Sequence, residues 1–264
     1  MIKLHLVALC IFTFFSSAAF AHTLPSPEKL EDLIKNRPSS IKVYEPHMSP
    51  AMHPIAIEYV GFPLEVVLSK VFGPAWGSVD GDYEFRALDG YASRVSPNLI
   101  KKYHPYLVFQ RMDGRAFKVQ NVHQHQKDIS LGPYYLVWDN IKHKELLEEG
   151  PYGWPYQINE IVISHGIPEA LVPNKKDKDA FIKEIKLTQK YCLNCHQLNG
   201  LGGSKYPNDL SESAKKMGEL EFIEWVTSPD KVKENSAMPA INKRLPEKER
   251  HEIALEIYHY LIAF

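Results

Sequence analysis

Five consecutive residues near the end of the chain combine two thiols with an imidazole: Cys192, Leu193, Asn194, Cys195 and His196. Cys-x-x-Cys-His is the pattern by which a c-type haem is attached to protein. The two thiols add to the two vinyl groups of haem, and their short separation places both on one turn. His196 then lies where it can offer a proximal imidazole to the iron. The sequence therefore predicts one covalently bound haem c.

Two other interpretations of the cysteine pair are a structural zinc half-site and a thioredoxin-like redox pair. Zinc needs two more ligands at matching spacing, and the chain has no second cysteine pair. A thioredoxin motif opens a helix after a strand, whereas the residues before Cys192 have a helical pattern. The histidine directly after Cys195 favours haem over both.

A low-spin haem also needs a sixth ligand, and the only methionines after the motif are Met217 and Met238. Met238 precedes Pro239 in a stretch with few signals of regular structure, so we expect it to be the ligand. A thioether raises the reduction potential relative to a second imidazole. The alternatives are that Met238 only packs on the haem edge or that Met217 ligates. We expect His251 and His259 to lie on the outer face of the last helix.

Residues 1–21 have the pattern of a cleaved signal peptide. Lys3 precedes an apolar run over residues 6–15 that is too short to span a bilayer, and Ala19-Phe20-Ala21 fits the small-x-small cleavage rule. An uncleaved anchor helix and a lipidated Cys10 are weaker alternatives. We therefore expect a periplasmic protein with no stable membrane span after cleavage.

The composition is that of a soluble globular protein. Of 264 residues, 44% are hydrophobic and 24% charged, and 31 basic against 32 acidic side chains leave a net charge of −1. The chain has no excess of basic residues of the kind that would indicate nucleic-acid binding. The length predicts about two domains.

Residues 41–165 read mainly as short strands rich in β-branched and aromatic residues, with turn signals between them. We expect strands at 41–44, 55–60, 83–88, 106–110, 134–138 and 157–164. Helical patterns cover 28–35, 63–72 and 142–149. Residues 166–178 carry prolines and a charged run and read as a linker that few contacts cross. Beyond it the pattern is helical, with helices at 219–226 and from Pro246 to the end.

Residues 179–264 resemble a class I cytochrome c domain. The matching features are the Cys192–His196 motif, the loop with Gly200, Gly202 and Gly203, the pair Met238-Pro239, and a last helix with Tyr258 and Leu261. The resemblance implies a small all-α bundle around one haem, and one-electron transfer as its role. It also implies that a proline carbonyl, here of Pro207, holds the second nitrogen of the ligand histidine.

Several phrases in residues 22–165 resemble the molybdopterin-binding domain of the sulfite-oxidase type. They are Gly61-Phe62-Pro63-Leu64, Asp89-Gly90-Tyr91, Asp113-Gly114, Gly132-Pro133 and Trp154-Pro155-Tyr156-Gln157. That family binds molybdenum through a cysteine thiolate, and this chain has no cysteine between residues 22 and 191. We therefore carry over no catalytic residue.

Three other places have metal-ligand residue types. Glu45-Pro46-His47-Met48 with Met52-His53 offers imidazoles and thioethers, which suit copper, and His22 as a new N-terminus could bind copper with its amine. His123 and His125 could share one strand face. For each, a solvated loop or terminus is the preferred interpretation. The many tyrosines and tryptophans of residues 83–156 could line a pocket, but core packing with polar tips at its edge is the preferred interpretation.

These observations predict an α+β protein: a signal peptide at 1–21, a β-rich domain at 22–165, a linker at 166–178 and an all-α cytochrome c domain at 179–264. The predicted function is one-electron transfer through a haem held by Cys192, Cys195, His196 and Met238. The β-rich domain would dock a periplasmic redox partner protein or a substrate. The alternatives are an oxidoreductase whose β-rich domain binds its own molybdopterin or copper, and a binding module for assembly.

Overall fold

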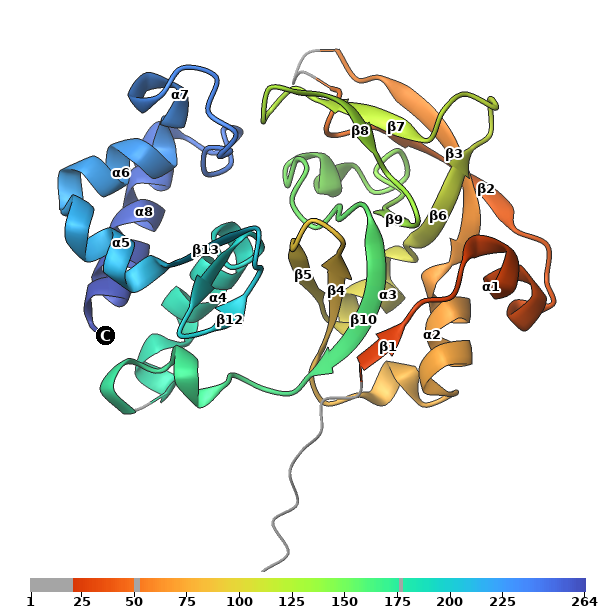
Figure 1. Ribbon diagram of the computed structural model, residues 1–264, viewed down its shortest axis with the longest axis horizontal. Helices are drawn as coiled ribbons and strands as arrows, with labels where there is room; N and C mark the ends of the chain where they lie inside the picture. Colours follow the sequence, from red (N-terminus) through yellow and green to blue (C-terminus); the bar gives the residue numbers. More distant parts are fainter. Residues whose placement is uncertain (1–20, 50–52, 176–177) are drawn as a thin grey trace, which may run out of the picture.

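The structure is a computed structural model that describes residues 21–49, 53–175 and 178–264. Figure 1 shows them in two parts, which we call the larger lobe (residues 21–165) and the smaller lobe (residues 178–264). Each lobe has its own hydrophobic cluster, one between Leu24 and Ile161 in sequence and one between Leu171 and Leu261. The predicted signal peptide, apart from Ala21, lies outside the described residues.

Two four-stranded antiparallel sheets frame the larger lobe in the part of the chain that is described. Their strands are β1 (Ala21–Thr23), β2 (Ser39–Tyr44), β3 (Ala56–Pro63), β4 (Asp82–Ala87), β5 (Ala92–Val95), β6 (Tyr106–Arg111), β9 (Tyr135–Val137) and β10 (Ile158–Ser164). One sheet has the order β2-β3-β6-β9 and the other β1-β10-β4-β5. All six predicted strands are confirmed. In β2, Ile41 and Val43 point into the core while Lys42 is exposed, as the two-residue period of a strand requires.

The larger lobe also contains α1 (Pro27–Ile34), α2 (Leu64–Phe72) and α3 (Pro97–Tyr103). In α2, Leu64, Val67 and Leu68 are completely buried at the spacing of one helical face, so this prediction is confirmed. The helix expected over 142–149 is wrong, since only a 3-10 turn, Lys144–Leu147, forms there. Other 3-10 turns are Trp76–Ser78, Glu169–Leu171, Pro173–Lys175 and Lys178–Phe181.

Aromatic side chains fill the core of the larger lobe. Tyr83 and Tyr134 are completely buried, and their hydroxyls donate to the carbonyls of Trp76 and Pro25, both at 2.8 Å. The Trp138 indole donates to a backbone carbonyl in the same way. The core interpretation of these rings is therefore confirmed, with polar tips satisfied at the edge of the core.

The smaller lobe contains α4 (Ile182–Tyr191), α5 (Leu210–Met217), α6 (Glu219–Thr227), α7 (Pro229–Val232) and α8 (Glu247–Ile262). Helix α8 contacts α4, α5 and α6, and it buries Ala254, Ile257 and Leu261 against them. This face unites the helices of the lobe around one apolar cluster.

The predicted fold class is wrong for the smaller lobe, which is not all-α. Strands β11 (His196–Leu198), β12 (Leu201–Gly202) and β13 (Tyr206–Asp209) form a sheet of order β12-β11-β13 directly after the cysteine motif. Asn199 and Gly200 both have positive φ, 49° and 76°, and turn the chain back between β11 and β12. Asn-Gly between apolar residues is the strongest short hairpin signal, and it explains the strands here. Helices also occur in both lobes, so the fold is mixed rather than divided into a β part and an α part.

Backbone hydrogen bonds join the two lobes around the cysteine motif. The Ala92 amide donates to the Asn194 carbonyl, and the Ser204 amide donates to the Gly90 carbonyl, both at 2.8 Å. Lys205 Nζ lies 2.7 Å from Asp89 Oδ2. The lobes are therefore paired through their main chains, contrary to the expectation that few contacts cross between them.

Gly90 makes this pairing possible, and its substitution is our first prediction. Its φ is +85°, and a Cβ atom would lie 2.7 Å from Ser204 Oγ and 2.8 Å from the Lys205 amide nitrogen. We expect Gly90→Ala to lower the free energy of unfolding by about 2–4 kcal/mol, from backbone strain plus this clash.

Gly114→Ala is the matched control for this substitution. Gly114 also has positive φ, +70°, but open space surrounds its Cβ position. We expect a loss of about 1 kcal/mol there, from strain alone. Urea denaturation of both variants measures the difference, and equal losses would contradict the close contact at Gly90.

Candidate functional site

The two cysteines lie on one tight turn at the end of α4. The amides of Cys192 and Leu193 both donate to the Thr188 carbonyl at 2.9 Å. The amides of Cys195 and His196 then donate to the Cys192 carbonyl, at 3.1 and 3.0 Å. The helix end therefore holds both thiols and the imidazole on one short, hydrogen-bonded segment.

Two glycines let the following loop close onto this turn. A Cβ atom on Gly203 would lie 2.2 Å from the Asn194 carbonyl oxygen, and one on Gly202 would lie 2.4 Å from that of His196. The Gly203 amide donates to the Leu193 carbonyl at 2.8 Å. A side chain at either position would push the loop off the motif.

Both cysteines are free thiols, and both are poorly suited to thiol–disulfide exchange. Burial raises the pKa of Cys192 to about 12, with the neighbouring Cys195 adding to the effect. Burial also raises the pKa of Cys195 to about 11, although Lys205 opposes it. Reactive redox cysteines have lowered pKa values, because the thiolate is the nucleophile. The environment of this pair therefore argues against the thioredoxin-like interpretation.

His196 presents a neutral imidazole with free ring nitrogens. Burial lowers the pKa of His196. Its ring stacks on Tyr206, with centroids 5.2 Å apart, and neither ring nitrogen forms a hydrogen bond with the described residues. The bond implied from the Pro207 carbonyl is thus not formed. A neutral imidazole with an uncommitted nitrogen is what a metal requires of a histidine ligand.

Met238 and Met217 both pack against the apolar cluster of the smaller lobe that contains Cys192. Met217 is the last residue of α5, whereas Met238 lies in the irregular segment between α7 and α8. The Met238 sulfur accepts a hydrogen bond from the Trp225 indole at 2.9 Å. His251 and His259 are exposed on α8 and bond Glu247 and Glu219, so their predicted outward position is confirmed.

This donor set fits a c-type haem. By residue type, two thiols that are not in a disulfide could form the two thioether bonds, and a neutral imidazole and a thioether could ligate the iron. The residues that would hold the group are Cys192, Cys195, His196 and Met238.

The larger lobe faces this turn with three tyrosines, Tyr91, Tyr152 and Tyr156. Burial raises the pKa of each of them, and the nearby Cys195 raises it further. Their phenols are therefore neutral. Sequence reasoning did not assign these residues to the site, because they are distant in sequence from the cysteines.

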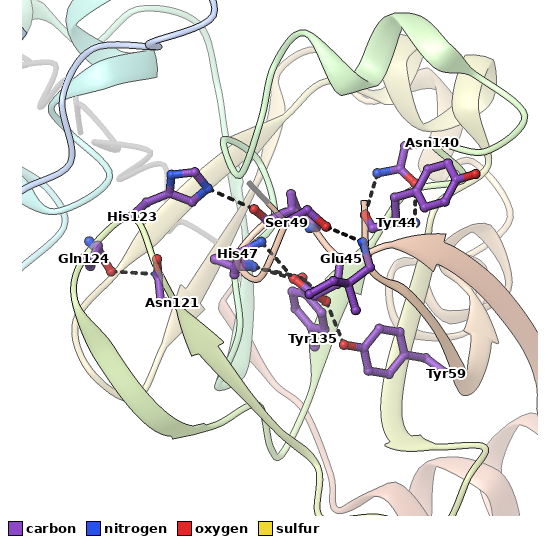
Figure 2. Close-up of polar contacts among 12 residues, drawn as sticks. Tyr44, Glu45, His47, Ser49, Tyr59, Asn121, His123, Gln124, Tyr135 and Asn140 are labelled. Carbon is purple, nitrogen blue, oxygen red and sulfur yellow. Dashed lines mark hydrogen bonds and ion pairs between the residues drawn. The ribbon is translucent and has the colours of Figure 1, made fainter. Parts of the chain in front are cut away.

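A second polar site lies inside the larger lobe, around the completely buried Glu45 (Figure 2). Its carboxylate accepts from the Tyr59 hydroxyl at 2.6 Å, from the Tyr135 hydroxyl at 3.0 Å and from His47 Nδ1 at 2.8 Å. The His47 amide is a further donor, at 3.1 Å. Both carboxylate oxygens of Glu45 therefore accept hydrogen bonds.

Glu45 is held in its ionised form. Burial by itself raises the pKa of Glu45, but the His47 hydrogen bond and charge and the Tyr59 hydroxyl more than offset it, so the pKa lies below its ordinary value. Burial and the Glu45 charge raise the pKa of Tyr59 and Tyr135, so both hydroxyls remain donors. The network orders the turn after β2, because the Ser49 amide donates to the Glu45 carbonyl at 3.0 Å.

The histidines that were considered as copper ligands contact other side chains of the protein. His47 is committed to Glu45 and Tyr135, and Met52 lies outside the described residues. His22 sits in β1 with its ring against Phe72. Over residues 21–49, 53–175 and 178–264, no three His, Cys, Asp or Glu side chains group so that they could hold a metal ion.

His123 and His125 do not share one strand face, and the preferred interpretation, a loop, is confirmed. Both lie in the turn between β7 (Lys118–Asn121) and β8 (Gln126–Ser130). His123 Nε2 bonds the Pro46 carbonyl and His125 Nε2 bonds Asp230 in α7, each at 3.0 Å. The hairpin turn therefore links the Glu45 region to the smaller lobe.

Neither a protein-family model nor a curated protein sequence matches this chain. Within the described residues, no helix combines the length and apolar character needed to cross a bilayer.

The Glu45 network leads to our second prediction. We expect Glu45→Gln to lower the free energy of unfolding at neutral pH by about 3 kcal/mol, because it leaves His47 and the tyrosines without their charged acceptor. Since the folded-state pKa of Glu45 is lowered, this stabilisation is present above the unfolded value of about 4.3 and is lost as the pH falls through the folded value. The difference in the free energy of unfolding between wild type and variant should therefore disappear at acid pH.

Glu58→Gln is the control, because Glu58 lies on the exposed side of β3. We expect an effect within about 0.5 kcal/mol there. Urea titrations at neutral and acid pH give the comparison. A constant gap between wild type and Glu45→Gln at all pH values would show that Glu45 is not ionised in the folded protein.

Proposed function

We propose that this protein binds one haem c covalently and works as a one-electron carrier outside the cytoplasm. The single observation that carries the proposal is Cys192-x-x-Cys195-His196 on one turn. Free thiols, a neutral imidazole and a thioether on the same lobe support it. The predicted signal peptide supports export, and after its cleavage Cys192 and Cys195 are the two cysteines that remain.

Each proposed ligand has a separate task. Cys192 and Cys195 anchor the group through two thioether bonds, so that it cannot dissociate. His196 and Met238 would ligate the iron, and a thioether ligand would keep the potential above that of a bis-histidine site. When bound, the haem supplies a Fe(III)/Fe(II) couple. On the larger lobe, the Tyr152 ring packs against Tyr191, which directly precedes the attachment turn.

In this proposal the larger lobe docks a redox partner protein or positions a substrate. Its main-chain pairing with the attachment turn supports a fixed orientation between the docking surface and the haem site. A partner that binds the larger lobe would then meet the haem site at a constant distance. This is what efficient electron exchange between two proteins requires.

A second candidate function is an oxidoreductase whose larger lobe binds its own small molecule. The observation that favours it is an open cleft of about 620 Å³, which is within the usual range for ligand sites. Its lining includes Lys42, Tyr103, His104, Asp139 and His143. Metal analysis and mass spectrometry of the purified protein separate the two, since the carrier contains iron alone.

Our third prediction concerns covalent attachment. We expect haem to remain on the chain after denaturation, because thioether bonds survive unfolding. A denaturing gel stained for haem peroxidase activity should show a band near the mature mass. Cys192→Ala together with Cys195→Ala should remove the stain. Extraction of wild-type haem into acidified organic solvent would overturn the proposal.

Our fourth prediction concerns the sixth ligand. We expect the oxidised protein to have the weak near-infrared sulfur-to-iron charge-transfer band, because a thioether is the second axial ligand. Met238→Ala should abolish the band, whereas the matched control Met217→Ala should retain it. Survival of the band in Met238→Ala would show that the ligand assignment is wrong.

A further inference from the structure

A short segment of the larger lobe binds the segment that carries Met238. The Tyr152 hydroxyl donates to the Ala240 carbonyl at 2.9 Å, and Asn242 Nδ2 donates to the Glu148 carbonyl at 2.7 Å. Arg244 Nη1 donates to the Leu147 carbonyl. Residues 147–152 thus contact residues 240–244 at three successive points.

Tyr152 connects both halves of the proposed haem site. Its hydroxyl holds the carbonyl two residues after Met238, and its ring meets the ring of Tyr191 edge-on, with centroids 5.2 Å apart. Tyr191 directly precedes Cys192. Tyr152 is half-buried, and desolvation raises its pKa, with Tyr191 and Cys192 contributing, so its hydroxyl keeps the proton that it donates.

The Met238 segment also has contacts within the smaller lobe, although it lacks regular structure. It contains no helix or strand between the end of α7 at Val232 and the start of α8 at Glu247. Within the smaller lobe, the Ile241 amide donates to the Val226 carbonyl at 2.8 Å, and the Met238 amide donates to Ser236 Oγ at 3.2 Å. Ala240, Ile241 and Asn242 are nevertheless buried. The Trp225 indole also donates to the Met238 sulfur at 2.9 Å, and Lys243 Nζ lies 3.5 Å from Asp230 Oδ2. Contacts from the larger lobe therefore add to those that the smaller lobe makes with this segment.

We propose that Tyr152 is a positioning residue for Met238, so that the larger lobe holds the sixth ligand in place. The inference rests on the proposed function. A neutral thioether is a weak ligand, and it competes with other ligands only while its segment is held close to the iron. The larger lobe then acts on the haem site through the hydroxyl of Tyr152 as well as through docking.

The test uses the full-length haem-loaded protein and the variant Tyr152→Phe, which keeps the ring and removes the hydroxyl. Imidazole is titrated against the oxidised protein while the near-infrared band is followed. We expect the imidazole concentration that removes half of the band to fall about tenfold, the size of one lost hydrogen bond. We also expect a lower midpoint potential, because Met238 ligation becomes weaker.

Tyr134→Phe is the matched control. Tyr134 is also a tyrosine of the larger lobe whose hydroxyl donates to a backbone carbonyl, that of Pro25, at 2.8 Å. The two variants should show similar losses in urea denaturation, but only Tyr152→Phe should change the imidazole titration. Asn242→Ala removes the neighbouring bond to Glu148 and should act in the same direction, so the test does not depend on the folding of one variant.

The outcomes are distinguishable. An unchanged imidazole titration in Tyr152→Phe, with the urea midpoint lowered as in Tyr134→Phe, assigns a structural role only and overturns the inference alone. A wild-type chain without covalent haem, or without the near-infrared band, overturns the proposed function and this inference with it. An equal change in the imidazole titration of Tyr134→Phe also overturns the inference, because the effect would then not be specific to the Met238 segment.

Discussion

The main-chain pairing between residues 90–92 and the attachment turn is the contact on which the arrangement depends. Two amide–carbonyl bonds join Gly90 and Ala92 to Ser204 and Asn194, and glycines on both sides allow the backbones to approach. Backbone bonds of this kind do not tolerate sliding, since a shift leaves buried donors unpaired. The pairing therefore fixes which larger-lobe side chains face the cysteines.

This pairing makes one site out of two hydrophobic clusters. Each lobe buries its own apolar residues, yet Tyr91, Tyr152 and Tyr156 of the larger lobe lie close enough to Cys195 for it to raise their pKa. The segment that carries Met238 likewise bonds residues 147–152 rather than only its own helices. A mixed site of this kind couples ligand geometry to the contact between the lobes.

The buried Glu45 network has a related structural consequence. It orders the turn after β2, and this turn lines a small cavity of about 90 Å³ together with Gly150 and Arg244. His123 bonds Pro46 in the same turn, while His125 reaches Asp230 in the smaller lobe. The turn that Glu45 orders thus lies across this small cavity from Leu147 and Gly150, in the segment that contacts residues 240–244.

The sequence by itself determined the elements and chemical groups whose signals are local. Strand alternation, the apolar face of α2 and the Cys192–His196 spacing depend only on residues close in sequence, and the structure has the expected strands, helix and turn. Asn199-Gly200 was also a local hairpin signal, but the helical patterns around it led to the expectation of an all-α domain. Only the tertiary structure decided the partners of Glu45, the separate fates of His123 and His125, and the bond from Tyr152 to Ala240. These contacts join residues tens of positions apart, and their formation depends on strand order and lobe packing, which no local pattern specifies.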